Sequence, residues 1–205
     1  MGLTTEQLRI SLDALAAIEP AFAGPLARAG YPEPRIRERG YVTLLRTIIG
    51  QQVSVKAADA VWRRLGEALG EIADPALMIA ASDETLRGAG LSRQKNGYAR
   101  SLAGLILSGE LDLAGLPGDD EEAIAALTSV KGIGRWSAEI YLLFAEGRGD
   151  IWPAGDLAVQ IAVGRLMGLA GRPDEKSVRA IGEHWRPHRG AAAIFAWHSY
   201  NSEVI

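Results

Sequence analysis

The sequence LTSVKGIGRWSA, residues 127–138, carries the most informative pattern in the chain. A helical spacing of apolar residues ends just before Gly132 and resumes just after Gly134, which predicts two helices joined by a very short connection. Because glycine tolerates positive φ and the close approach of another backbone, the two glycines permit a tight hairpin. The apolar Ile133 between them would insert into the core and fix the turn.

This hairpin has the features of a phosphate-binding site. Amides near its glycines would point outward at a helix N-terminus, where free N–H groups and the helix dipole favour an anion. Positive side chains stand on both sides of the glycines. A plain helix connection that contains two glycines is the alternative for so short a motif. We therefore predict phosphate contacts from Lys131, Gly132, Ile133, Gly134 and Arg135.

Most of the remaining chain also has helical periodicity. Thr4, with Gln7 three positions later, has the spacing of a capping box, and Ser54, Ser82 and Ser92 are suitable N-caps. We expect helices at 4–18 and 41–50, after each of the three serines, and at 120–130, 135–146, 156–168, 174–185 and 188–202. No stretch has a convincing strand pattern, so the predicted fold is all-α, with about ten helices.

We expect a single domain over residues 1–205, divided into two helical lobes. The clearest seam is the Gly-, Pro- and Asp-rich segment 109–120. One division places approximately 1–40 and 150–205 in one lobe and approximately 41–149 in the other.

Composition excludes several function classes. The chain of 205 residues has no cysteine, so disulfides, Cys-ligated zinc, iron–sulfur clusters and a thiol nucleophile are excluded. Its three histidines lack metal-site spacing, and we expect no metal. The net charge of −3 neither favours nor forbids nucleic acid. The sequence shows no signal peptide and no apolar run near the ~20 residues of a membrane span. We expect an intracellular monomer of the cytoplasm or nucleoid, with no membrane partner.

A second candidate site follows in residues 150–156, DIWPAGD. Pro153 and Gly155 interrupt the chain, and a helical pattern begins at Asp156. An N-cap is the simplest interpretation, since aspartate is strongly preferred there. A capping carboxylate is also held rigidly, and the helix dipole favours its anionic form. Such an anion can stabilise positive charge that develops on a sugar.

Residues 131–160 together resemble the helix-hairpin-helix/GPD superfamily of DNA base-excision glycosylases. The resemblance implies two helical lobes with an active-site cleft between them, a hairpin that holds the DNA backbone without reading bases, and Asp156 as the catalytic residue. Asp150 matches the family position less well. Bifunctional members carry a lysine two residues after the last hairpin glycine, where this chain has Trp136. The resemblance therefore implies a monofunctional enzyme without lyase activity.

Four segments are similar to the 3-methyladenine DNA glycosylase II (AlkA-like) branch. They are GIGRWSAE at 132–139, IIGQQVS at 48–54, GLSRQK at 90–95 and WRPHRGAA at 185–192. This resemblance covers approximately residues 40–200. It implies hydrolysis of the N-glycosidic bond of alkylated purines, such as 3-methyladenine and 7-methylguanine, after the nucleotide is flipped out of duplex DNA.

The resemblance also suggests which residues meet the flipped nucleotide. Gln52 is the first candidate for the wedge that fills the vacated space, and Gln51 the second; the alternative is that both amides cap or bridge helices. Trp136 is the first candidate for a π surface that attracts a cationic base.

Further candidates complete the predicted site. The base pocket would also include Tyr141, Trp152 and Ile140, and Lys95 would bind a phosphate. Trp197 has the helical spacing of a core residue.

No cofactor is expected, apart from a monovalent cation that could sit on the hairpin carbonyls. Two other functions stay open at this point. One is a hairpin module that binds DNA without catalysis, and the other is a glycosylase for deaminated or oxidised bases.

Overall fold

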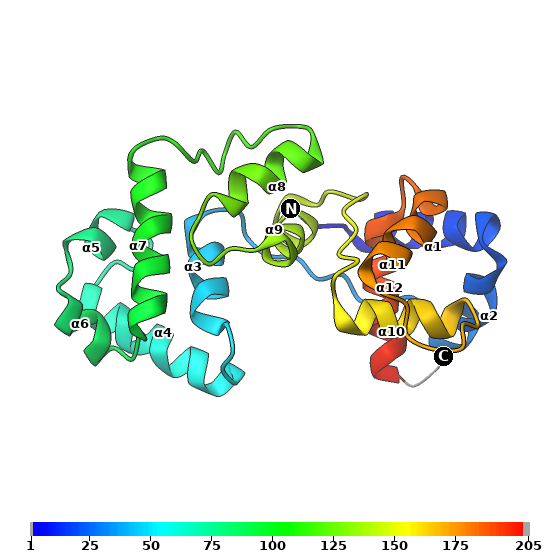
Figure 1. Cartoon of the computed structure of the whole chain (residues 1–205), viewed down its shortest axis with the longest axis horizontal. Coiled ribbons are helices and arrows are strands. Elements are labelled where there is room, and N and C mark those ends of the chain that lie inside the picture. Colours follow the sequence, from blue (N-terminus) through cyan, green and yellow to red (C-terminus); the bar gives the residue numbers. More distant parts are fainter. Residues whose placement is uncertain (1, 203–205) are drawn as a thin grey trace. The chain divides into compact units, whose positions relative to one another are not determined.

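The computed structural model describes residues 2–202; Met1 and residues 203–205, which the domain prediction included, lie outside the described part. Figure 1 shows helices joined by loops, and no strand occurs within residues 2–202, so the all-α prediction is confirmed. In chain order the elements are α1 (Thr5–Ile18), η1 (Pro20–Phe22), α2 (Ala23–Ala29), α3 (Tyr41–Gly50), α4 (Val55–Leu69), α5 (Pro75–Ala80), α6 (Asp83–Gly88), α7 (Arg93–Leu107), α8 (Asp120–Thr128), α9 (Arg135–Tyr141), the π-helical η2 (Leu142–Glu146), α10 (Leu157–Leu166), α11 (Glu175–Gly182), η3 (Glu183–Trp185) and α12 (Arg189–Ser202).

The helix starts follow the capping signals in the sequence. Thr4 and Gln7 form the predicted capping box of α1. The hydroxyls of Ser54, Ser82 and Ser92 accept backbone N–H groups at the starts of α4, α6 and α7. These caps satisfy donors that have no partner inside their helices, which explains why short local patterns located the starts correctly.

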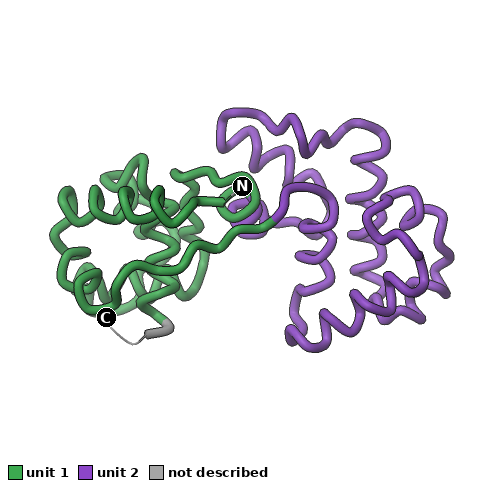
Figure 2. Tube along the Cα trace, turned by 180° about the vertical axis from the view of Figure 1, so that it is seen from behind, with its two compact units in different colours: residues 1–37, 142–205 green, residues 38–141 purple. Residues whose placement is uncertain are grey.

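The chain divides into two compact units (Figure 2). Unit 1 contains residues 1–37 and 142–205, and unit 2 contains residues 38–141. The expected second boundary lay near residue 150, so residues 142–149 differ from the expectation. They belong to unit 1 because their contacts are there: the Phe144 ring lies 5.6 Å from that of Trp197, and Gly190 donates its N–H to Gly149 O.

The core of unit 1 is aromatic at its centre. Trp185 of η3 is 1% exposed, and it meets the rings of Phe22 and Trp152 edge to face, with ring centroids at 5.1 and 5.4 Å. Leu12 and Leu15 from the apolar face of α1 are fully buried. This packing supports the loop that leads to the candidate aspartate.

Unit 2 packs around α3 and α7, which contact each other extensively. Leu45 and Ile48 of α3 and Ala99 and Leu102 of α7 are completely buried. The same two helices lie beside the hairpin, so the core of this unit positions it.

The structure differs from the predicted elements in a few places. The short helices α2 and α5 were not predicted, and they are too short to show clear periodicity. The helix expected at 135–146 is α-helical only to Tyr141 and continues as the π-helical η2. The expected helix at 174–185 is divided into α11 and the 3₁₀ turn η3.

Candidate functional site

The hairpin between α8 and α9 belongs to unit 2 and has the predicted tight geometry. Gly132 has φ of 86°, a conformation that favours glycine. A Cβ atom there would also lie 2.2 Å from a ring atom of Tyr98, which belongs to α7. Ile133 is 4% exposed, and its N–H donates to Val130 O at 3.0 Å. Both the backbone conformation and the tyrosine ring therefore require glycine at position 132.

The backbone amides of the hairpin are available to an anion. Lys131 donates its N–H to the Ser101 hydroxyl at 3.1 Å, and its side chain is exposed. Within residues 2–202, the N–H groups of Gly132 and Gly134 donate to no protein acceptor. Two amides and one exposed ammonium group at the start of α9 form a suitable phosphate site.

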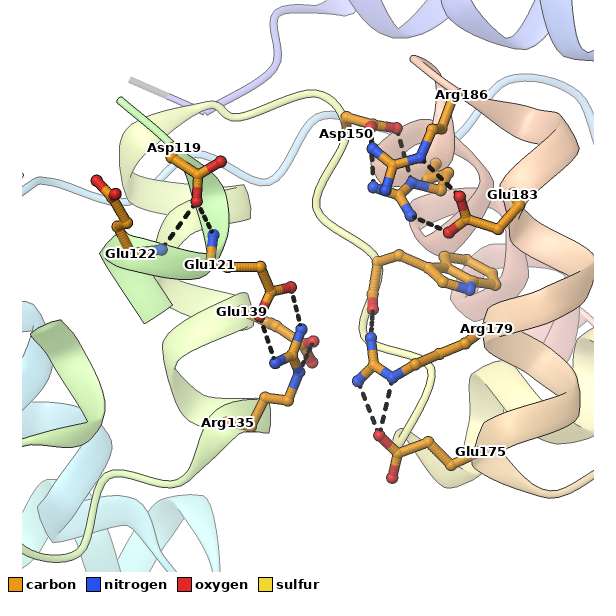
Figure 3. A network of polar contacts seen from close by, with 12 residues as sticks. Asp119, Glu121, Glu122, Arg135, Glu139, Asp150, Glu175, Arg179, Glu183 and Arg186 are labelled. Carbon is orange, nitrogen blue, oxygen red and sulfur yellow. Dashed lines mark hydrogen bonds and ion pairs between the residues drawn. The ribbon is translucent and has the colours of Figure 1, made fainter. Parts of the chain in front are cut away.

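Arg135 makes other contacts than those predicted (Figure 3). Its two terminal nitrogens donate to Glu121 at 2.8 and 2.5 Å, and its Nε donates to Glu139 at 2.9 Å. The hydrogen bonds that Arg135 donates to Glu121 are the main reason that the pKa of Arg135 is raised. These two ion pairs link α8 to α9 and argue against the phosphate contact, which stays a prediction for Arg135.

Lys95 is also engaged within the protein. Its Nζ donates to Ile49 O at 2.6 Å, near the C-terminal end of α3. Partial burial lowers the pKa of this ammonium group. This hydrogen bond joins α7 to α3 and argues against the phosphate contact of Lys95, which stays a prediction.

The two wedge candidates have different environments. Gln51 is half-buried, and its Nε2 donates to Gly132 O at 2.8 Å, so its amide bridges α3 and the hairpin. Gln52 is exposed and has φ of 54°, which is uncommon for a residue with a side chain. Of the two, Gln52 alone has the exposed position that a wedge requires.

Three of the four predicted pocket residues are buried. Ile140 is 7% exposed, and Tyr141 is 2% exposed with its hydroxyl accepting the N–H of Gly40 at 2.8 Å. Trp152, in unit 1, is 3% exposed and donates its Nε1–H to Val178 O at 3.0 Å. Trp152 is thus placed in the aromatic core, because its ring packs on Trp185.

Trp136 differs from these residues, because 47% of its surface is exposed. It lies on α9, one residue after Arg135, and follows the hairpin directly. Its ring is the one large aromatic surface that the predicted set leaves accessible.

Asp156 belongs to unit 1 and caps α10. Its Oδ1 accepts the N–H of Val159 at 3.0 Å, so the N-cap interpretation is confirmed. The same oxygen accepts the indole N–H of Trp197 from α12 at 3.0 Å. Two donors from different helices therefore fix the orientation of this half-buried carboxylate.

Trp197 is the site residue that sequence reasoning missed. Its helical spacing indicated a core residue, and no local pattern connects it with an aspartate 41 positions away. The Phe144 ring packs against it from η2. The indole is held between a neighbouring ring and the carboxylate, which makes it a rigid hydrogen-bond donor.

The other carboxylate in this region, Asp150, is occupied by arginines (Figure 3). Arg189 donates to it twice at 2.8 Å, and Arg186 donates once at 2.8 Å. Arg179 donates to the backbone carbonyl of Trp152 at 3.4 Å. These contacts anchor the loop that leads to Asp156, and they give Asp150 a structural role.

No group of three or more His, Cys, Asp or Glu residues within the described part of the chain could hold a metal ion. Three carbonyls of the hairpin already accept hydrogen bonds: Val130 O from Ile133, Gly132 O from Gln51, and Gly134 O from Ala138. The cation that we considered at these carbonyls stays a prediction.

The described residues include no single helix that is long and apolar enough to cross a membrane. The bent pair Thr5–Ile18 and Pro20–Ala29 passes that test only when both helices are taken together, and only by length and composition.

Two relatives with similar sequences are named DNA-3-methyladenine glycosylases. The DNA-3-methyladenine glycosylase 1 of Schizosaccharomyces pombe is 32% identical over 165 residues, which cover 78% of this chain and 72% of that protein. A Bacillus subtilis protein named putative DNA-3-methyladenine glycosylase YfjP is 28% identical over 167 residues. These cover 78% of this chain, which spans 58% of that relative's length.

Two solved structures with similar folds also have titles that name 3-methyladenine DNA glycosylases or glycosidases. A DNA-3-methyladenine glycosidase from Bacillus halodurans superposes with a TM-score of 0.87 at 30% identity, covering 94% of this chain and 90% of that one. The S. pombe 3-methyladenine DNA glycosylase in complex with abasic DNA gives a TM-score of 0.79 at 28% identity, with 93% and 96% covered.

One family model matches residues 45–187, which include the hairpin, Asp156 and both wedge candidates. Its description is HhH-GPD superfamily base excision DNA repair protein. The hairpin and the capped aspartate are the two features from which the sequence indicated this superfamily. The chain therefore belongs to the HhH-GPD superfamily of base excision DNA repair proteins.

Proposed function

We propose that this protein is a monofunctional DNA glycosylase that hydrolyses the N-glycosidic bond of alkylated purines in duplex DNA. The observation that carries the proposal is the carboxylate of Asp156, which accepts N–H groups from Val159 and Trp197. The names of the relatives, 3-methyladenine DNA glycosylases, support the substrate class. Within this class the type II branch is proposed from the segments that resemble it.

Asp156 would act on the sugar. As the bond to the base breaks, the sugar acquires oxocarbenium character, as in glycoside hydrolysis. A fixed carboxylate stabilises this charge without reorganising, and it can also orient or deprotonate the attacking water. Alkylated purines such as 3-methyladenine and 7-methylguanine carry positive charge and leave readily, so the reaction needs no strong general acid.

The exposed ring of Trp136 would face the flipped base. Aromatic faces attract cations by roughly 0.5–2 kcal/mol, which favours alkylated purines over neutral bases. The same residue occupies the position at which a lyase would need a lysine. We therefore propose that the enzyme leaves an intact abasic strand.

Unit 2 would supply the grip on DNA. The amides of Gly132 and Gly134, with the side chain of Lys131, would hold backbone phosphates, and Gln52 would fill the space of the flipped nucleotide. All proposed contacts come from one chain, in accordance with a monomer acting inside the cell, and the steps require only water as co-reactant.

The test is release of free bases from duplex DNA treated with a methylating agent, followed by chromatography. Asp156→Asn is a well-matched variant, because asparagine retains an oxygen that can accept from both Val159 and Trp197. We expect 3-methyladenine or 7-methylguanine from the wild type and none from the variant. Equal release by both would identify another catalytic carboxylate, and no release by the wild type would overturn the proposal.

Strand integrity tests the absence of lyase activity. Reacted DNA should break only after alkali treatment, because no amine attacks the sugar. Breaks before alkali treatment would contradict this part of the proposal.

A further inference from the structure

One face of α7 contacts both the hairpin and the end of α3. Lys95, Tyr98 and Ser101 follow each other at intervals of three residues, so they lie on the same side of the helix. Lys95 donates to Ile49 O at 2.6 Å, and the Ser101 hydroxyl accepts the N–H of Lys131 at 3.1 Å. The ring of Tyr98 fills the space beside the hairpin glycine, where a Cβ would lie 2.2 Å away.

Gln51 joins these two elements directly. Its backbone N–H donates to Ile48 O at 3.3 Å, which ends α3, while its side-chain Nε2 donates to Gly132 O at 2.8 Å. Gln51 therefore donates one hydrogen bond to α3 and one to the hairpin. It also directly precedes Gln52, so any shift of Gln51 moves the exposed glutamine.

The backbone of Gln52 requires such support. Its φ of 54° is sparsely populated by residues with a side chain, and these conformations persist where the surroundings fix them. Within residues 2–202, the bond from the Gln51 amide to Gly132 O is the one side-chain hydrogen bond between the 51–54 turn and the hairpin.

We infer that Gln51 is a positioning residue, which holds Gln52 at a fixed place relative to the phosphate-binding hairpin by its hydrogen bond to Gly132 O. This inference rests on the proposed function. The hairpin fixes where the DNA backbone lies, and a wedge must enter the helix at a set distance from it. Small misplacements of such groups cost large factors in rate.

A double-mutant cycle tests the inference with Gln51→Leu, Gln52→Ala and the double variant. Gln51→Leu removes the donor at nearly the same volume, and thermal unfolding checks that each variant is folded. The readouts are single-turnover base release, the fluorescence of 2-aminopurine placed beside the lesion, and the Kd for an undamaged duplex.

If Gln51 acts through Gln52, Gln51→Leu lowers base release and the fluorescence rise by about tenfold while the Kd changes less than about twofold. In the Gln52→Ala background the same substitution then changes release by less than about twofold. Losses that multiply in the double variant would overturn the inference, because Gln51 would then act on its own. A weakened Kd that accounts for the lost release would also overturn it.

The wild-type measurements separate this inference from the proposed function. If the wild type raises 2-aminopurine fluorescence but frees no base, the proposed function alone is overturned. The double-mutant cycle is then evaluated from the fluorescence change instead of base release. A wild type that binds the duplex without raising fluorescence would overturn the inference.

Should Gln51→Leu fail to fold, Gln51→Met provides the second variant. It removes the same amide donor to Gly132 O with a more flexible side chain. We expect the same loss of fluorescence with an unchanged Kd, and an unchanged fluorescence would overturn the inference.

Discussion

Trp197 donates its indole N–H to Oδ1 of Asp156 at 3.0 Å, so a residue of α12 fixes the carboxylate that caps α10. The ring of Phe144 lies 5.6 Å from the indole and limits its movement. The orientation of the proposed catalytic group therefore depends on tertiary packing as well as on the helix cap.

Trp197→Phe should slow base release while the protein stays folded. Phenylalanine retains an aromatic ring beside Phe144 but removes the N–H donor. A hydrogen bond to a charged group contributes about 1.5–3 kcal/mol, so we expect single-turnover release to fall roughly tenfold to a hundredfold. Trp62→Phe is the matched control, because Trp62 lies in unit 2 and packs against Arg46 instead of Asp156. The guanidinium carbon of Arg46 lies 4.7 Å from the centroid of the Trp62 ring. Equal losses in both variants would contradict a specific role of the indole N–H.

The two hairpin glycines should respond differently to alanine. Gly132→Ala places a methyl group against Tyr98 at a positive φ, and we expect destabilisation of about 1–3 kcal/mol. At Gly134 a Cβ would meet nothing within 4 Å, so Gly134→Ala should change the free energy of unfolding by less than about 1 kcal/mol. Urea unfolding measures both. Equal stability of the two variants would contradict both the clash with Tyr98 and the strain at the positive φ of position 132.

Salt dependence of DNA binding should separate the two lysines. A lysine that contacts one phosphate contributes about one unit to the slope of log Kd against log salt concentration. We expect Lys131→Met to lower this slope by about one and Lys95→Met to leave it unchanged, since Lys95 donates to Ile49 O. Filter binding or anisotropy between about 50 and 200 mM salt covers the needed range. A lower slope for Lys95→Met would restore its predicted phosphate contact.

Acid stability should depend on Glu183. Its hydrogen bond to Arg186 lowers the pKa of this carboxyl below the usual 4.5. The pKa of Glu183 is lower in the folded protein than in the unfolded chain. The resulting stabilisation is therefore complete above pH 4.5 and is lost as the pH falls through the pKa of the folded protein. Glu183→Gln should therefore flatten the acid limb of a plot of Tm against pH. An unchanged limb would show that the Arg186 and Arg189 contacts to Glu183 do not contribute.

Local signals in the sequence predicted the parts of the structure that depend on local physics. Thr4, Ser54 and Asp156 were identified as caps because a cap depends on the next three residues. Gly132 was identified because so short a connection favours a backbone conformation that glycine adopts, and its φ is 86°. The change to a π-helix after Tyr141 has no comparable signal.

The residues with unexpected roles act through distant partners. Lys95 meets Ile49 46 positions away, and Asp156 meets Trp197 41 positions away. Arg135 is an exception, since Glu139 follows it at the helical i,i+4 spacing and could have indicated an internal ion pair. A charged residue beside a binding motif should therefore first be checked for a carboxylate one turn away.

The discontinuity of unit 1 has a consequence for the order of events during synthesis. Its helix α1 packs against α12, while the whole of unit 2 lies between them in the sequence. During translation, unit 2 has all of its segments outside the ribosome before α12 exists, so it can complete its fold first. The aspartate and its indole partner come together only after the last helix is made. A nascent chain would thus acquire its hairpin of residues 131–135 before the proposed catalytic carboxylate is in place.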